Sequence, residues 1–201
     1  MFNAIVLAAG TSKRMGSKNK LTLKLRDKTI ISTVISSLSQ SKIDKITVVV
    51  GHKHKEVIEV LSEFPKVQII FNSLYELGQM TSIKAGMSSL DSECEAFLIC
   101  LGDMPSITSE EYNSLIDHYK DTLQKTDQPI VRPIYNDQVG HPVVFHHSYN
   151  ADILDAPNES DCKLIIGQNI DHYYPIQIDS GNFVLDIDNE EEYSQYIKRN
   201  S

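Results

Sequence analysis

The segment FNAIVLAAG, residues 2–10, is an apolar run that ends in a glycine. Along the rest of the chain, short runs rich in β-branched residues alternate with stretches whose apolar residues recur at helical spacing. This alternation is typical of an α/β fold, in which helices cover both faces of a mainly parallel central sheet. The pattern predicts strands at about residues 2–8, 45–51, 67–71, 96–101 and 130–134, with shorter strands near 143–146, 173–177 and 183–186.

Helices are predicted between these strands, because apolar residues recur at helical spacing over residues 30–38, 57–61 and 82–90. A fourth helix is expected to begin after Thr108 and to reach Leu123, since Thr108 and Glu111 have the spacing of a capping box. The periodicity weakens after residue 134. That part of the chain could form a small lobe or a long insertion over the carboxyl edge of the sheet, where open α/β sheets bind ligands.

Length and composition favour one globular domain, residues 1–201. Hydrophobic residues are 41% and charged residues 23% of the chain, which excludes intrinsic disorder. No apolar run is long enough for a transmembrane helix and no basic leader precedes the first strand, so we expect a cytoplasmic protein. Cys94, Cys100 and Cys162 form no C-x-x-C pair and are expected to be buried thiols, not disulfide or zinc ligands.

The charge is distributed unevenly along the chain. Residues 1–66 hold 12 Lys and Arg against 5 Asp and Glu, whereas residues 67–201 hold 7 against 22. The positive charge is concentrated between Lys13 and Lys28, directly after the first strand. This position suits a polyphosphate ligand. Nucleic acid is a poor fit, because the rest of the chain is acidic and no aromatic residues interleave the basic run.

The loop after the first strand carries the first candidate site. Residues 7–16 read LAAGTSKRMG, which contains neither the dinucleotide motif G-x-G-x-x-G nor a Walker A loop. The loop could still cradle an anion, because Gly10 permits unusual backbone conformations and basic side chains neutralise phosphate oxygens. An ordinary βα turn with solvent-facing basic residues is an equally weighted alternative.

A carboxylate follows the most apolar strand. Residues 96–101 predict a central strand buried on both faces, and Gly102, Asp103 and Pro105 come directly after it. Asp103 therefore lies at the carboxyl end of the sheet, where it is well placed to hold Mg²⁺. The alternative is a helix-capping or turn aspartate, but Thr108 already supplies the cap.

Two further groups of polar residues occur in the second half. His141, in Gly140-His141-Pro142, could bind an anionic acceptor or hydrogen-bond a turn carbonyl. Asp186 and Asp188 alternate along a short predicted strand. Because Asp188 and Glu191 also have the spacing of a helix cap, we interpret Asp188 as structural and Asp186 as the second metal ligand.

Taken together, these motifs resemble the nucleotidyltransferase family of molybdenum cofactor biosynthesis, in particular its cytidylyltransferase branch and the related xanthine dehydrogenase accessory proteins. The resemblance spans nearly the whole chain and rests on L-A-A-G-x-S-x-R-M-G at 7–16, Lys20-Leu21, G-Q-M-T-S at 78–82, G-D-M-P at 102–105, G-H-P at 140–142 and D-I-D at 186–188. It implies a Rossmann-like fold and Mg²⁺-dependent transfer of NMP from an NTP to a phosphate, with release of pyrophosphate.

The resemblance also implies roles for single residues. Residues 1–105 would form the nucleotide-binding half and residues 106–201 the acceptor-side half. The nucleotide would be bound by Leu7, Ala8, Ala9, Gly10, Thr11, Ser12, Arg14, Gly16, Lys20, Gly78 and Ser82. Arg14, Lys20 and Asp103 would be catalytic, Asp103 and Asp186 would bind Mg²⁺, and His141 would bind the acceptor. Ala9 stands where guanylyl-specific relatives carry glycine, which favours CTP, with molybdopterin as acceptor and a molybdenum hydroxylase as a possible recipient.

Departures from the family pattern leave alternatives open. Three residues separate Gly16 from Lys20 where many relatives have two, so Lys18 competes for the phosphate role. The usual L-L-P after the lysine is replaced by Thr22-Leu23-Lys24, and the segment G-D-x-G-A-R corresponds at best to residues 158–163. A sugar- or polyol-phosphate nucleotidyltransferase is therefore a second hypothesis. A third is a maturation protein that binds the molybdopterin nucleotide and its target hydroxylase without turnover.

Overall fold

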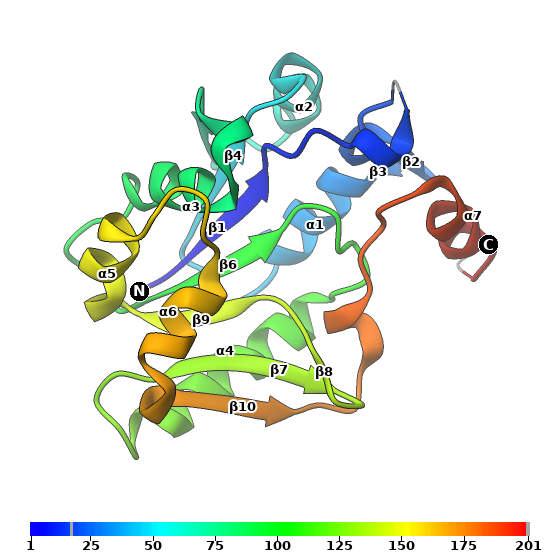
Figure 1. Cartoon of the computed structure of the whole chain (residues 1–201). Helices are drawn as coiled ribbons and strands as arrows, with labels where there is room; N and C mark the ends of the chain where they lie inside the picture. Colours follow the sequence, from blue (N-terminus) through cyan, green and yellow to red (C-terminus); the bar gives the residue numbers. More distant parts are fainter. Residues whose placement is uncertain (17, 200–201) are drawn as a thin grey trace.

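The computed structural model describes residues 1–16 and 18–199, and its centre is a mostly parallel sheet with the strand order β10-β7-β9-β6-β1-β4-β5 (Figure 1). The strands are β1 (Phe2–Ala8), β4 (Lys45–Val50), β5 (Gln68–Phe71), β6 (Ala96–Leu101), β7 (Ile130–Tyr135), β8 (Gln138–Val139), β9 (Val143–His146) and β10 (Tyr173–Gln177). Strand β8 pairs with β7, and β2 (Lys24–Leu25) and β3 (Lys28–Thr29) form a separate antiparallel pair.

The pairing confirms a mainly parallel sheet. Strand β1 pairs in parallel with β4 and β6, β4 with β5, and β7 with β10. Strand β9 runs antiparallel to both of its neighbours, β6 and β7. The chain after residue 134 thus adds strands to the same sheet, and β1 and β6 end side by side in its middle.

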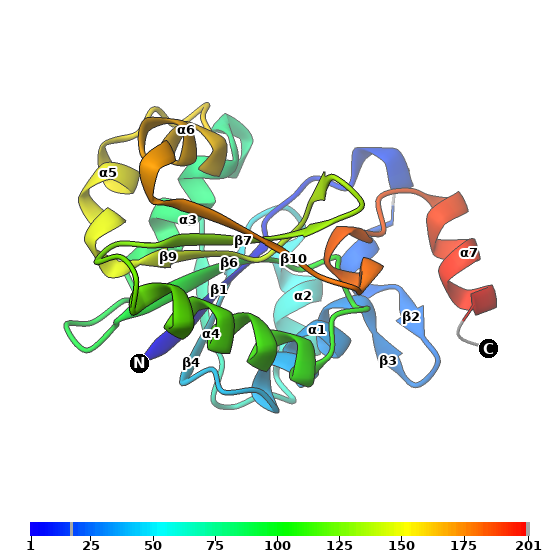
Figure 2. The same ribbon diagram turned by 90° about the horizontal axis from the view of Figure 1, so that it is seen from below.

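Helices cover both faces of the sheet, as predicted. Figure 2 shows α1 (Ile30–Ser39), α2 (His54–Leu61) and α4 (Ser109–Leu123) on one side, and α3 (Gln79–Met87), α5 (Asn150–Asp155) and α6 (Cys162–Gln168) on the other. Each layer has its own apolar core against the sheet. The last helix, α7 (Glu190–Arg199), lies beside the β2–β3 pair, and Tyr193 Oη donates a hydrogen bond of 2.7 Å to the carbonyl of Lys24.

Strand β6 is buried from Ala96 to Cys100. Phe97 and Ile99 belong to the core under α3, α5 and α6, whereas Leu98 and Cys100 belong to the core under α1, α2 and α4. A strand that carries apolar side chains on both faces is stable only between two helical layers. The predicted burial of residues 96–101 on both faces is confirmed.

Local sequence patterns predicted the start of one helix correctly and the starts of two others too late. The capping box at α4 is confirmed, since Thr108 Oγ1 accepts a hydrogen bond from Glu111 N and the Glu111 carboxylate accepts one from Thr108 N, at 3.2 and 2.8 Å. The helices predicted at 57–61 and 82–90 begin three residues earlier, at His54 and Gln79.

The strand predicted at residues 183–186 is wrong. The segment Gly181–Val184 is a 3-10 helix, and the residues up to α7 form no strand. Two separate backbone hydrogen bonds, not the regular pairing of a β-sheet, hold residues 183–187 in place. Phe183 O accepts a hydrogen bond from His141 N at 2.8 Å, and Ile187 N donates one to Asp103 O at 3.0 Å. This segment therefore crosses the carboxyl edge of the sheet.

The cysteines are buried free thiols, as predicted. Within the described ranges, 1–16 and 18–199, no helix has both the length and the apolar character needed to span a membrane.

Candidate active site

A cavity of about 630 Å³ lies at the carboxyl ends of β1 and β6. A volume of this size suits a small-molecule ligand. The cavity is lined by Leu7, Ala8, Ala9, Gly10, Thr11, Ser12, Lys20, Leu21, Tyr75, Glu76, Gly78, Gln79, Ser82, Leu101 and Asp103. We call it the main cavity. It includes the predicted nucleotide-binding residues except Arg14 and Gly16.

The loop after β1 forms one wall of the main cavity. Ala9 is fixed by close packing, because its carbonyl accepts a hydrogen bond from His52 N at 3.3 Å and a Cβ on Gly51 would lie 2.8 Å from the Ala9 methyl group. Gly10 does not adopt a left-handed conformation; Ser12 does, with φ of 50°. Gly10 instead has no heavy atom within 4 Å of the place a Cβ would take, so its contribution is open space for a ligand.

The amino end of α3 forms the opposite wall. Gly78 has φ of 132°, and a Cβ there would lie 2.5 Å from the carbonyl oxygen of Asn158, so only glycine fits. The Asn72 amide donates hydrogen bonds to Thr81 Oγ1 and Ser82 Oγ at 2.9 and 3.0 Å. These buried contacts hold the first turn of α3 rigidly against the main cavity.

Lys20 connects the main cavity to a group of carboxylates. Its Nζ donates hydrogen bonds to Asp103 Oδ2 and, at 2.6 Å, to Asp188 Oδ1. Arg14 donates to the other oxygen of Asp188. One carboxylate oxygen each of Asp103, Asp186 and Asp188 lies within 4.8 Å of the others. Three acidic groups thus meet two basic groups at the edge of the sheet.

The environment shifts the pKa of several of these groups. Burial lowers the pKa of Lys20, but the attraction of Asp103 and Asp188 outweighs burial and leaves it above the ordinary value of 10.5. Burial raises the pKa of Asp188, but Lys20 and Arg14 outweigh that effect and lower it. For Asp186, burial and then the charges of Asp188 and Asp103 raise the pKa. The raised pKa of Asp186 shows that negative charge around this carboxyl is not fully neutralised, so an additional cation would stabilise the cluster.

The donor set fits a divalent cation. Asp103 Oδ1 is buried and accepts no hydrogen bond from any described residue. A buried carboxylate oxygen without a donor is unfavourable, and a bound cation would satisfy it. Carboxylate oxygens are the ligands that Mg²⁺ and similar hard cations prefer. Asp103, Asp186 and Asp188 are the residues that could hold it.

The assignment of Asp188 as a helix cap is wrong. Asn189 supplies the cap of α7, because its Oδ1 accepts a hydrogen bond of 2.9 Å from Glu192 N. The Glu192 carboxylate accepts from Asp188 N at 2.7 Å, which leaves the Asp188 side chain free to bind Lys20 and Arg14. The alternation in D-I-D indicated that Asp186 and Asp188 lie on the same side. The helix-cap spacing between Asp188 and Glu191 led instead to the structural interpretation of Asp188.

The structure also separates the two candidate lysines. Lys18 Nζ forms an exposed ion pair with Glu190 at 3.1 Å, whereas the Lys20 side chain is only 12% exposed and lines the main cavity. Asn19 sets this difference, because its Oδ1 accepts from Leu21 N and begins the short 3-10 helix Lys20–Thr22. Arg14 lies outside the main cavity, with its side chain 69% exposed.

His141 lies two residues before β9, where the chain enters that strand. Gly140 N donates to Pro133 O and His141 N donates to Phe183 O, each at 2.8 Å, and the His141–Pro142 peptide is cis. His141 Nε2 lies 3.4 Å from Arg132 Nη2. Burial, and then the charge of Arg132, lower the pKa of His141 to about 4. The imidazole is therefore neutral near pH 7, and Nε2 accepts from the guanidinium.

Sequence reasoning missed several residues of this region. Tyr75, Glu76, Gln79 and Leu21 line the main cavity. Gln79 and Leu21 lie inside motifs that already indicated the site, but Tyr75 and Glu76 lie in the short 3-10 helix Tyr75–Leu77, which carried no sequence signal. Arg132 on β7 carried no signal either, because a single arginine in an apolar strand matches no motif.

Residues 4–172 match the family model described as MobA-like NTP transferase domain. The molybdenum cofactor cytidylyltransferase of Escherichia coli (strain K12) is 29% identical over 193 residues, which are 95% of this chain and 93% of the relative. A probable molybdenum cofactor guanylyltransferase of Methanosarcina mazei is 34% identical over 118 residues, 57% of this chain and 52% of the relative.

Solved structures share the fold along the whole chain. Rv0371c from Mycobacterium tuberculosis H37Rv has a TM-score of 0.83 at 19% identity and covers 98% of this chain and 97% of its own. A nucleotidyl transferase from Methanothermobacter has a TM-score of 0.81 at 19% identity, with 100% and 97% covered. The Rossmann-like α/β fold that the sequence predicts is confirmed.

Proposed function

The chain belongs to the MobA-like NTP transferase family, and from this premise we propose that it transfers CMP from CTP to the phosphate of molybdopterin and releases pyrophosphate. The observation that carries the proposal is the meeting of Lys20, Asp103 and Asp188 at the mouth of the main cavity. A site for nucleotidyl transfer needs positive charge for a triphosphate and carboxylates for its metal beside one cavity.

Different residues would bind the triphosphate, the nucleoside and the metal ion. The loop from Ala8 to Gly16 would hold the triphosphate, and Lys20 and Arg14 would neutralise its oxygens. Gly78 and Ser82 would lie near the base and ribose. Asp103 and Asp186, with Asp188 beside them, would hold Mg²⁺, which when bound neutralises charge on the phosphate oxygens.

The chemistry needs no strong general base. An oxygen of the acceptor phosphate is already anionic at neutral pH and attacks the α-phosphorus of CTP in line with the leaving group. The bond from that oxygen to the α-phosphorus forms as the bond from the α-phosphorus to the pyrophosphate oxygen breaks, and pyrophosphate leaves with the electron pair. Positioning and charge neutralisation by Lys20 and Arg14 then supply most of the rate.

Two observations support cytidine over guanosine. Ala9, which lines the main cavity, stands where guanylyl-specific relatives carry glycine. The relative that covers nearly the whole chain is named as a cytidylyltransferase, whereas the guanylyltransferase match covers about half of both chains. A molybdenum hydroxylase that receives the product is the partner this function implies.

The test combines nucleotide binding with turnover. Thermal stabilisation by CTP, GTP, ATP and UTP, with and without Mg²⁺, is expected to be selective for CTP with Mg²⁺, since a ligand of the folded state raises its stability. Pyrophosphate release should then require molybdopterin and fail with sugar phosphates. Release with a sugar phosphate would replace the acceptor, and Mg²⁺-dependent binding without any release would favour the non-catalytic maturation role.

A further inference from the structure

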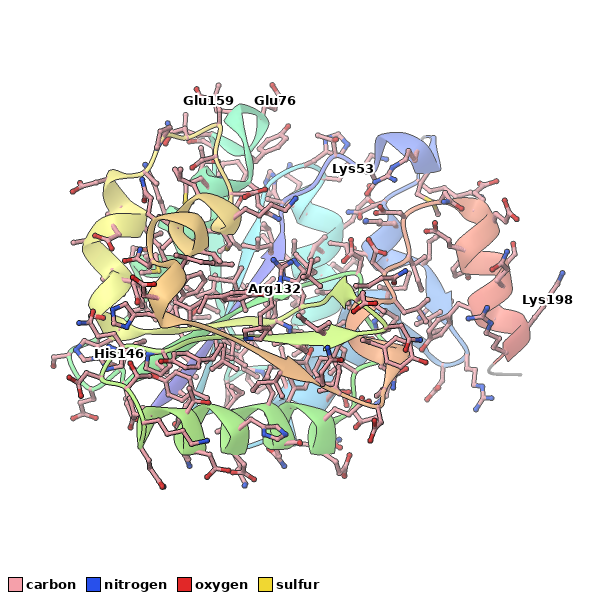
Figure 3. The ribbon with its side chains drawn as sticks, turned by 60° about the horizontal axis from the view of Figure 1, so that its bottom comes forward. Lys53, Glu76, Arg132, His146, Glu159 and Lys198 are labelled. Carbon is pink, nitrogen blue, oxygen red and sulfur yellow. The ribbon has the colours of Figure 1, made fainter. Side chains whose placement is uncertain are left out.

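Arg132 is a buried cation without a counter-charge. It lies on β7, its residue is only 6% exposed, and no ion pair within 4.0 Å joins it to a carboxylate of the described residues. Burial of an unpaired charge is unfavourable, so a protein retains one where an anion binds. Figure 3 shows Arg132 near the centre of the molecule, in contrast to the labelled lysines at its outline.

The Arg132 guanidinium is held in place by two hydrogen bonds, but most of its N–H donors have no partner among the described residues. Nε donates to the Gly140 carbonyl at 2.7 Å, and Nη2 donates to His141 Nε2 at 3.4 Å. A guanidinium has five N–H donors, so three remain after these two bonds. Because Gly140 cannot carry a Cβ, which would lie 2.4 Å from Phe183 O, the turn that orients Arg132 is itself fixed.

Arg132 and His141 lie on the face of the sheet that α3 covers, outside the lining of the main cavity. Strand β9 pairs Val143 with Ile99, so His141, two residues before Val143, lies at the level of Leu101, which lines the cavity. Ile130 packs in the core under α3, α5 and α6, and side chains alternate along strands, so Arg132, two residues later on β7, faces the side that α3 covers. His141 lies on that side too, because its Nε2 is 3.4 Å from Arg132 Nη2.

Asp161, the acidic residue near His141, caps helix α6. Asp161 and Lys163 both influence the His141 charge, but Asp161 Oδ1 accepts a hydrogen bond of 2.7 Å from Lys163 N and caps α6. Asp161 forms no ion pair with Arg132 within 4.0 Å among the described residues. The remaining N–H donors of the guanidinium therefore have no anionic partner among the described residues.

We propose that Arg132, held by Gly140 and His141, binds the phosphate monoester of the acceptor. The inference rests on the proposed nucleotidyl transfer, whose acceptor contributes a phosphate oxygen as nucleophile. The planar fork of arginine matches two phosphate oxygens, which leaves the third for attack. Neutral His141 accepts from the fork and keeps its plane fixed, so His141 is a positioning residue and Arg132 is the specificity-determining one.

The test compares Arg132→Gln, Arg132→Lys and the matched control Arg199→Gln, which removes an exposed guanidinium at the end of α7. Inorganic phosphate, phenyl phosphate and CTP with Mg²⁺ are titrated separately into ¹³C-histidine-labelled protein, and the His141 resonances and overall spectrum are followed by NMR. We expect phenyl phosphate to shift His141 in the wild type and in Arg199→Gln. In Arg132→Gln its dissociation constant should rise at least about tenfold, while that of CTP stays within about twofold.

The outcomes separate the two proposals. Unchanged phenyl phosphate affinity in Arg132→Gln, or an equal loss of CTP affinity, overturns the acceptor role of Arg132. Arg132-dependent phosphate binding without any CTP binding would leave the anion site standing and overturn the nucleotidyl transfer. If Arg132→Gln does not fold, Arg132→Lys decides, because a point charge without the fork should still weaken phenyl phosphate binding and not CTP binding.

Discussion

Lys20 Nζ lies 2.6 Å from Asp188 Oδ1, although 168 residues separate the two in sequence. The same Nζ binds Asp103, so one ammonium group holds two of the three clustered carboxylates. Lys20 thus neutralises two of the three carboxylates that could hold a divalent cation, although Asp103 Oδ1 has no partner among the described residues. We therefore expect Lys20 and the proposed divalent cation to compete for Asp103 and Asp188, and the proposed triphosphate would give Lys20 another partner.

Lys20→Met tests this competition. Removal of the ammonium charge should tighten Mn²⁺ binding in the absence of nucleotide by about tenfold, because one like charge no longer opposes the metal. Turnover should fall by at least about 100-fold, since the triphosphate loses its buried cation. Mn²⁺ binding is measured by electron paramagnetic resonance. Lys18→Met is the control, because Lys18 pairs with Glu190 at the surface. Equal Mn²⁺ affinity in both variants would contradict the competition.

Asp103→Asn separates function from stability. Asp103 lies at the end of β6, outside the apolar core, so we expect the melting temperature to change by only a few degrees. Activity should fall by at least about 100-fold, and stabilisation by CTP should no longer depend on Mg²⁺. Calorimetry with and without Mg²⁺ checks both parts. Asp117→Asn, at an exposed ion pair with Lys42, is the matched control. Full activity of Asp103→Asn would refute the metal assignment.

The sequence predicted the elements that are set by local patterns. The apolar runs at 2–8 and 96–101 became β1 and β6, and their shared end placed Asp103 at the main cavity. Long-range contacts decided the rest. Ile187 N binds Asp103 O, which draws residues 186–188 across the sheet edge as an irregular segment where alternation predicted a strand. No local pattern contains that contact.

Competition between two local patterns explains the error at Asp188. The spacing to Glu191 indicated a helix cap, but Asn189 takes that role in the structure. Arg132 illustrates a different limit, because its meaning depends on Gly140 and His141, which reach it only through the turn before β9. A residue whose partners come from tertiary structure cannot be recognised from its sequence neighbours.

Gly10→Ala and Gly78→Ala should behave differently. A Cβ on Gly10 meets no heavy atom within 4 Å, so the free energy of unfolding should hardly change, while CTP affinity falls because the methyl group takes ligand space. A Cβ on Gly78 would lie 2.5 Å from Asn158 O at a φ of 132°, so this variant should lose about 1–3 kcal/mol of stability. Urea unfolding and CTP titration measure both. An unaltered CTP affinity in Gly10→Ala would remove this loop from the nucleotide site.

His141 should make the stability of the protein depend on pH. Its pKa is lowered to about 4 in the folded state, by burial and then by Arg132, whereas an unfolded histidine titrates near 6.5. As pH falls below about 6.5 the unfolded state binds a proton that the folded state does not bind until about pH 4, so the free energy of unfolding decreases with falling pH across this window. The full effect is up to about 3 kcal/mol.

Urea unfolding at pH 7 and pH 4.5 isolates this effect when wild type is compared with His141→Asn. Other groups also titrate on acidification, Asp186 among them because burial raises its pKa, but their contributions are common to both proteins and cancel in the difference. His141→Asn should therefore lose less stability on acidification than the wild type does. His118→Asn, at an exposed position on α4, should retain the wild-type dependence. If His141→Asn and the wild type lost the same stability between these pH values, His141 would not be held neutral beside Arg132, and the positioning of the guanidinium by an imidazole acceptor would have to be abandoned.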